Sequence, residues 1–104
     1  MTNEIDSMRL REMQAGGNLR LVDVRSDAEV ARGMIAGAQH IPLNQLAPKA
    51  EEWDQQAPLV FCCQSGARSA QAAQFFAGKG FTQVYNLQGG LNVWVRNGLP
   101  LSGA

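Results

Sequence analysis

The stretch VFCCQSGARSAQAAQFF, residues 60–76, passes from an apolar run through a polar turn into an alanine-rich segment. Its first part belongs to PLVFCC (58–63), a continuous apolar run typical of a parallel strand buried on both faces. Its last part continues as SAQAAQFFAGKG (69–80), where alanine and phenylalanine share one helical face and glycines can end the helix. The stretch therefore predicts a strand, a turn at the carboxyl edge of a sheet, and a helix. In α/β proteins this edge is where ligands bind.

The rest of the chain alternates segments typical of strands and of helices. Before this stretch we expect a helix from Asp6 or Ser7 to Gly16-Gly17, a strand at 19–25, a helix at 26–33 and a strand at 38–42. The segment 43–56 is mostly helical in composition, and we expect Pro48 to split it or to mark a helix start. After it we expect a strand and glycine turn at 81–90 and a short helix at 91–98. This alternation predicts an α/β fold, with a central parallel sheet flanked by helices on both faces.

Composition narrows the class of protein. The chain has 104 residues, a length typical of one domain, so we expect a single domain over residues 1–104. Nine basic and nine acidic residues balance, which argues against a nucleic-acid partner or a polybasic membrane module. The apolar runs are far shorter than the ~20 residues that cross a bilayer. The first residues, MTNEIDSMRLREM, resemble no secretion signal, so we expect a cytoplasmic protein without membrane contact.

The two cysteines are neighbours, Cys62 and Cys63. Adjacent cysteines cannot close a useful disulfide loop, because native disulfides need unstrained geometry. One histidine, His40, and one adjacent cysteine pair also give poor ligand spacing for zinc, so we expect no metal site. Two interpretations are left open: a buried structural pair or a reactive thiol.

Cys63 has the surroundings of a reactive thiol. Gly66 permits a turn whose backbone N–H groups point inward and can bind an anion. The helix that starts near Ser69 adds its positive end, and Arg68 adds a fixed charge. These features lower the pKa of a cysteine and favour its thiolate. Cys62 should face the other side of the strand, and we interpret it as a core residue.

The loop can be counted from either cysteine. Counted from Cys62, it reads C-x5-R-S and resembles the phosphate loop of cysteine-dependent phosphatases. That loop has glycine three positions after its nucleophile and histidine before it, whereas this chain has Ser65 and Phe61. Counted from Cys63, the third position is Gly66, and the loop is one residue shorter. The Cys63 register fits better, and a phosphatase or arsenate-type reductase that uses Cys62 is the less favoured alternative.

Residues elsewhere have more modest predicted roles. We expect Arg25 to form a salt bridge with Glu29 or Asp27 that fixes the strand to its helix. His40 is interpreted as a packing or turn residue, and Trp94 as a core residue. The paired glycines Gly89-Gly90 are expected to serve backbone geometry near the pocket.

Three ordered motifs resemble the single-domain rhodanese (thiosulfate sulfurtransferase-like) family. They are LVDVR (21–25) followed by GMIAGAQHIP (33–42), the loop CQSGARS (63–69), and VYNLQGGLNVWVRNGLP (84–100). Together they extend over nearly the whole chain. One departure is Met34, where the family's first signature usually has histidine.

The resemblance implies a rhodanese-like fold and a sulfurtransferase that works by ping-pong kinetics. Cys63 would take a sulfane sulfur from thiosulfate or a similar small anionic donor, and hold it as a persulfide. The acceptor would be cyanide in assays and a thiol or protein cysteine in cells, with no metal or organic cofactor. Substrate-binding groups would come from Gln64, Ser65, Gly66, Ala67, Arg68 and Ser69, with Arg68 orienting the anion. A persulfide carrier or a non-catalytic binding module is the alternative.

Overall fold

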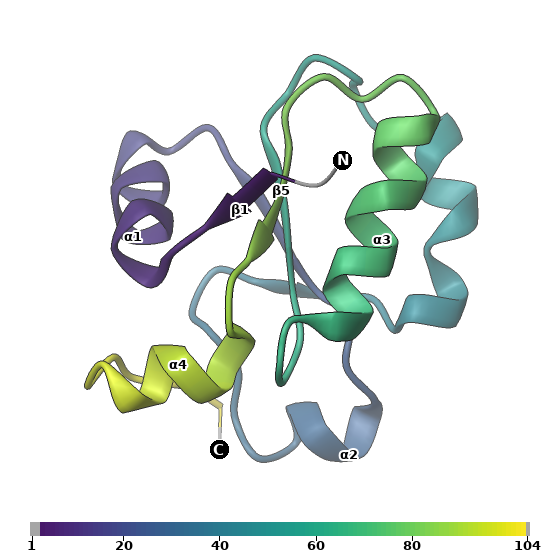
Figure 1. The fold of residues 1–104 in the computed structure, drawn as a ribbon. Coiled ribbons are helices and arrows are strands. Elements are labelled where there is room, and N and C mark those ends of the chain that lie inside the picture. The colour runs from purple at the N-terminus through teal and green to yellow at the C-terminus, as the bar shows by residue number, and fades with distance from the viewer. Residues whose placement is uncertain (1–2, 104) are drawn as a thin grey trace.

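The computed structural model describes residues 3–103, and its centre is a five-stranded sheet in the order β1-β5-β4-β2-β3 (Figure 1). All four strand pairs are parallel, as predicted. The strands are β1 Asn3–Ile5, β2 Arg20–Asp23, β3 Gln39–His40, β4 Leu59–Cys62 and β5 Val84–Leu87. The central strand, β4, is completely apolar and buried along its whole length, because helices cover the sheet on both sides.

Within residues 3–103, three α-helices and two 3₁₀ helices connect the strands, and a fourth α-helix follows the last strand. They are α1 Ser7–Gly16, α2 Asp27–Val30, η1 Leu43–Gln45, η2 Ala47–Glu51, α3 Ala67–Gly78 and α4 Gly90–Arg96. The predicted caps are present. Asp6 accepts from the backbone N–H of Arg9, and α1 ends at Gly17 in the left-handed conformation. Ser26 and Glu29 form a reciprocal capping box at the start of α2.

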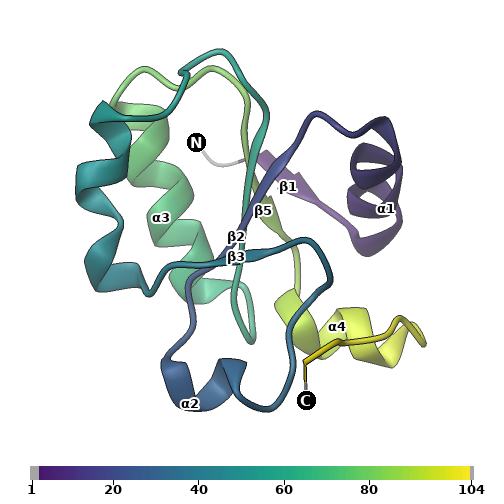
Figure 2. The same cartoon turned by 180° about the vertical axis from the view of Figure 1, so that it is seen from behind.

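The helix α3 lies on one side of the sheet, and α1 and α4 lie on the other (Figures 1 and 2). The sheet separates two apolar clusters. The first contains the inner side of α3, including Phe76, with residues of η2 and of its flanking segments. The second contains Leu10 of α1 together with Leu91 and Trp94 of α4. Cys63 belongs to the first cluster and Cys62 to the second, so the two neighbouring cysteines face opposite sides of the sheet, as the strand period predicts.

One predicted segment differs in part from the structure, and one strand was not predicted. The segment 43–56 is less helical than predicted, since it forms only the short 3₁₀ helices η1 and η2, but the predicted effect of Pro48 is confirmed. Pro48 lies at the start of η2, and since proline has no N–H and clashes with the preceding turn, one helix cannot continue through it. Strand β1 was not predicted, because it has three residues, of which only Ile5 is buried.

Within residues 3–103, no helix is both long and apolar enough to cross a membrane.

Candidate active site

The polar turn after β4 closes around the sulfur of Cys63. Gly66 adopts a positive φ of 100° and caps α3, which therefore begins at Ala67 rather than near Ser69 as predicted. Three donors point at the Sγ atom of Cys63: the backbone N–H of Gly66 at 3.1 Å, the backbone N–H of Ser69 at 3.4 Å and the hydroxyl of Ser69 at 3.3 Å. The loop thus forms an anion-binding cradle around the thiol.

This cradle changes the acidity of Cys63. The residue is completely buried, and burial by itself raises the pKa of its thiol. Hydrogen bonds from the hydroxyl and backbone of Ser69 and from the backbones of Gly66 and Ser65 act in the opposite direction and outweigh it. The pKa of Cys63 therefore lies below its ordinary value, so its thiolate forms more readily than that of a free cysteine. A thiolate with aligned donors is a nucleophile whose charged products are also stabilised.

Cys62 has the opposite environment. It lies on the other face of β4, completely buried in the second apolar cluster. Burial, with a further contribution from the Asp23 carboxylate, raises the pKa of Cys62 well above its ordinary value. Cys62 therefore remains a protonated core residue, which agrees with the predicted role.

The N-terminus of α4 is hydrogen-bonded to the backbone of the loop. The backbone N–H of Leu91 donates to the carbonyl oxygen of Cys63 at 2.9 Å, and that of Asn92 donates to the carbonyl of Gln64 at 3.0 Å. Gly90 has φ 59°, and a Cβ atom built there would lie 2.3 Å from the carbonyl oxygen of Cys63. The expected role of the paired glycines in backbone geometry near the site is thereby confirmed.

Asn86 is a site residue that the sequence interpretation missed. Its buried side chain on β5 donates from Nδ2 to the carbonyl oxygen of Gly66 at 3.1 Å and to both carboxylate oxygens of Glu4, at 3.0 and 3.1 Å. It therefore connects strand β1 to the loop residue that donates to Cys63. A signal was present, since asparagine is unfavourable in the middle of an apolar strand.

Arg68 lies in the first turn of α3, between two residues that contact Cys63, but its guanidinium is not free. It donates to both carboxylate oxygens of Glu29, each at 2.8 Å. This hydrogen-bonded pairing is the main cause that raises the pKa of Arg68. It also lowers the pKa of Glu29 to about 2, against a smaller opposing effect of burial and with further help from Ser26. The Arg68–Glu29 ion pair thus connects α2 to the first turn of α3 beside the loop.

The predicted partner of Arg25 is wrong. Arg25 does not pair with the carboxylate of Glu29 or Asp27; it pairs with the buried Asp23 two residues earlier, at 2.9–3.0 Å. Its remaining N–H groups donate to the carbonyl of Gly33 at 2.7 Å, to the carbonyl of Glu29 at 3.4 Å and to the side chain of Gln64 at 3.2 Å. The strand turns within two residues, which brings this carboxylate closer than those on α2.

The structure also shows the contacts and the exposure of the remaining residues that the sequence analysis named. Gln64 donates to Asn92 at 2.7 Å, while Ser65 and Ala67 are exposed at the tip of the loop. His40 lies half-buried on β3 and not in a turn, with its Nε2 atom 2.8 Å from the carbonyl oxygen of Arg25. Trp94 is buried and donates to the carbonyl of Pro100 at 2.9 Å, as suits a core residue.

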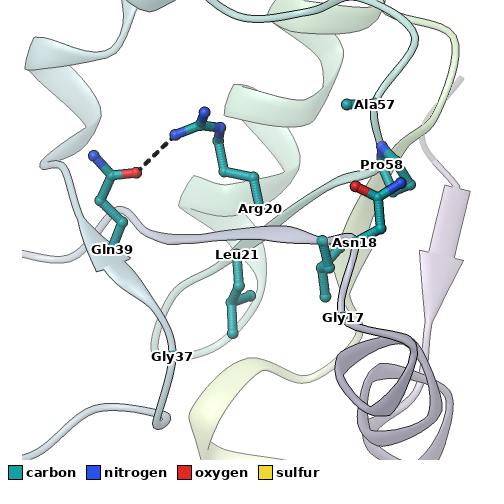
Figure 3. A pocket seen from close by; sticks show the side chains of 9 residues that line it. Gly17, Asn18, Arg20, Leu21, Gly37, Gln39, Ala57 and Pro58 are labelled. Atoms are coloured by element: carbon teal, nitrogen blue, oxygen red, sulfur yellow. Dashed lines mark hydrogen bonds between the residues drawn. The ribbon is translucent and has the colours of Figure 1, made fainter.

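Two cavities differ in their relation to this loop. One of about 290 Å³ lies beside it and is lined by residues that include Glu29, Arg32, Gln64 and Leu91. The other, of about 350 Å³, lies at the opposite edge of the sheet, where β2 and β4 begin (Figure 3). There Arg20 donates to Gln39 at 3.0 Å. Within residues 3–103, no cluster of three or more His, Cys, Asp or Glu side chains is placed to hold a metal ion.

The chain belongs to the rhodanese-like domain family, whose pattern matches residues 7–97. It is 40% identical to a sulfurtransferase of Allochromatium vinosum, over 97% of this chain and 95% of that protein. It is 34% identical to the thiosulfate sulfurtransferase GlpE of Ectopseudomonas mendocina, over 86% of this chain and 82% of that protein. The human single-domain sulfurtransferase TSTD1 has the same fold, with a TM-score of 0.81 and 33% identity over 92% of this chain and 97% of that one.

Proposed function

We propose that this chain is a single-domain sulfurtransferase of the rhodanese type that carries sulfur as a persulfide on Cys63. The observation that carries the proposal is the cradle of Gly66 and Ser69 donors around the Cys63 sulfur, which lowers the pKa of that thiol. Two relatives with a similar length are sulfurtransferases by name, one of them a thiosulfate sulfurtransferase. The raised pKa of Cys62 argues against the phosphatase register.

In the first half-reaction, the Cys63 thiolate attacks the outer sulfur of thiosulfate. A new S–S bond forms, the S–S bond of thiosulfate breaks, and sulfite leaves with the electron pair. The product is a Cys63 persulfide, whose terminal sulfur carries the negative charge. The backbone N–H groups of Ser65, Gly66 and Ser69 are placed to stabilise that charge, as they stabilise the thiolate.

In the second half-reaction, a nucleophilic acceptor attacks the terminal sulfur of the persulfide. Cyanide gives thiocyanate, and a thiolate of a small molecule or a protein gives a new persulfide; either step returns Cys63 to its thiolate. No metal or organic cofactor enters this scheme, because sulfur is itself the group that is carried. The complete burial of Cys63 favours a donor that presents a terminal sulfur atom, as thiosulfate does, over one that presents a bulky group.

The proposal is tested by the intact mass of the protein after incubation with thiosulfate. Wild type and the Cys62→Ser variant are expected to gain the mass of one sulfur atom, and Cys63→Ser is expected to gain none. Addition of cyanide should remove the sulfur and release thiocyanate. A persulfide that survives in Cys63→Ser, or that is lost in Cys62→Ser, would overturn the assignment of the nucleophile. Loading without turnover would instead identify a persulfide carrier.

A further inference from the structure

The two arginines nearest to the loop are both neutralised by carboxylates. Arg25 is buried against Asp23, and Arg68 forms a two-pronged pair with Glu29. Arg32 also lines the cavity beside the loop, but its side chain is exposed, where solvent and salt screen its charge. Among residues 3–103, a dianion that approaches Cys63 therefore meets no arginine that is both free of a carboxylate and shielded from solvent.

Glu29 is held in place by more than Arg68. Its Oε1 atom also accepts from the backbone N–H and from the hydroxyl of Ser26, each at 3.0 Å, as part of the capping box of α2. The carboxylate lines the cavity beside the loop together with Gln64. A carboxylate with this many donors stays ionised at any physiological pH and stays near the mouth of the site.

A purely structural role does not account well for this arrangement. The Arg68 and Glu29 side chains are 38% and 26% exposed, and ion pairs at such positions contribute only about 0–1 kcal/mol to stability. The larger effect of the Arg68–Glu29 pair is on the net charge near the loop, which a charged substrate encounters. The charge of Arg68 interacts with that of Cys63, since the pKa of Arg68 is raised mainly by Glu29 and to a lesser extent by the Cys63 thiolate, so a change in the effective charge of Arg68 reaches the sulfur.

We propose that Glu29 is a specificity-determining residue, which cancels the charge of Arg68 and so selects sulfur donors with one negative charge over donors with two. The inference rests on the proposed function, since it concerns donors to Cys63. Methanethiosulfonate and thiosulfate form a matched pair for this purpose. Both offer a terminal sulfur to the thiolate and give the same persulfide, but the first releases methanesulfinate from a monoanion, and the second releases sulfite from a dianion.

The experiment compares kcat/KM for the two donors in wild type and in Glu29→Gln. Glutamine keeps the capping box, because its amide can serve at that position. Removal of one negative charge close to the site is expected to raise the ratio of kcat/KM for thiosulfate to that for methanethiosulfonate, roughly fivefold or more. Glu12→Gln is the control: it removes the carboxylate of an exposed pair with Arg9 on α1, and its ratio should equal that of wild type.

Arg68→Gln supplies the opposite change. It leaves the Glu29 carboxylate uncompensated, so the ratio is expected to fall below the wild-type value. The added preference of Glu29→Gln for thiosulfate should also weaken as salt rises, because it comes from a charge. An equal loss with both donors in Glu29→Gln would show that Glu29 only positions Arg68, and would overturn the inference. Absence of a persulfide from either donor in wild type would instead overturn the proposed function.

Discussion

Ser69 donates twice to Cys63, through its hydroxyl at 3.3 Å and through its backbone N–H at 3.4 Å. The two residues are separated by the whole loop, yet one turn of α3 brings them together because Gly66 reverses the chain between them. Ser69 is completely buried, so its hydroxyl is held against the sulfur and does not exchange partners with water. The Cys63 sulfur, which we propose as the nucleophile, thus obtains its charge stabilisation from its own loop.

Replacement of Ser69 by alanine should make Cys63 less reactive at neutral pH. Loss of a hydrogen bond to the charged sulfur raises the pKa of Cys63. The pH at which the rate of alkylation by iodoacetamide reaches half its maximum should therefore rise. At pH 7 we expect a decrease of roughly tenfold or more, since hydrogen bonds to charged groups contribute about 1.5–3 kcal/mol. Ser65→Ala is the control, because the Ser65 hydroxyl accepts from Ala67 and does not contact the sulfur. Identical pH profiles for the two variants would contradict this assignment.

Gly90→Ala should damage the site more than it damages the fold. The new Cβ atom would lie 2.3 Å from the carbonyl oxygen of Cys63, so the loop must move. Gly98→Ala is a matched control, since Gly98 has φ 80° but a Cβ atom there would have nothing within 4 Å. Both variants should lose about 1–2 kcal/mol of stability from left-handed strain, and Gly90→Ala should lose more because its Cβ atom also meets the backbone of Cys63 and Gln64. Only Gly90→Ala should also lose sulfur transfer, by at least roughly tenfold. Equal activities in thiosulfate assays would refute the proposed close packing.

Asp23→Asn should destabilise the protein strongly. The change leaves the charge of Arg25, which is only 3% exposed, without its partner. Breaking a buried pair in this way costs about 3–5 kcal/mol, which urea unfolding would measure. Glu12→Gln, which breaks an exposed pair, should change the free energy of unfolding by less than about 1 kcal/mol. A similar small effect in both variants would show that the buried pair contributes no more than the exposed one.

The Glu29–Arg68 pair should make stability depend on acid pH. The pKa of Glu29 is lowered to about 2 in the folded protein from an ordinary value of 4.5. A carboxylate with a lowered pKa stabilises the fold fully above its unfolded-state pKa, and this contribution disappears as the pH falls through the folded-state pKa. The stability difference between wild type and Glu29→Gln should therefore be constant above about pH 5 and vanish towards about pH 2. Urea unfolding at several pH values measures it; a difference that persists at pH 2 would argue against the ionic pairing.

Asn86→Leu should loosen the loop. The substitution removes the donor to the carbonyl of Gly66 and leaves the Glu4 carboxylate without that partner. The Gly66 carbonyl keeps the backbone N–H of Ala70 as a donor at 3.2 Å, so the loss is that of one hydrogen bond, about 0.5–1.5 kcal/mol, at the residue that donates to the sulfur. We expect lower kcat/KM for thiosulfate together with faster hydrogen exchange at Gly66. Unchanged exchange at Gly66 would show that Asn86 does not support the loop.

The sequence predicted those features that depend on near neighbours. Strand alternation placed Cys62 and Cys63 on opposite faces, and local capping signals located Gly17 and Ser26 at helix ends. The partners of Arg68 and of Gln64 could not be predicted in the same way. Glu29 and Arg68 are 39 positions apart, and Gln64 and Asn92 are 28 apart. Such contacts depend on how connections cross the sheet edge, which no local pattern specifies.

The segment 43–56 shows a second reason why local structure could not be fully predicted from the sequence. Its composition favours a helix, but Pro48 interrupts it. The short 3₁₀ helices formed instead allow Leu46 and Ala50 to pack in the same apolar cluster as α3. Trp53, after η2, stacks on Phe76 with ring centroids 5.6 Å apart. Packing against α3 therefore decided the local conformation where intrinsic preference was ambiguous.

Because Cys62 and Cys63 are adjacent, the loop that follows β4 could in principle surround either sulfur, and the two loops would differ in length by one residue. The register of β4 decides which of the two cysteines lies at the loop. The pairing of β4 with β2 sets Cys62 opposite Asp23 and leaves Cys63 as the first residue beyond the strand. A slip of one residue in β4 would exchange the two sulfurs, placing Cys62 at the mouth of a longer loop with room for a larger anion. In this fold, the size of the group that a cysteine can hold is thus a property of strand register as much as of loop composition.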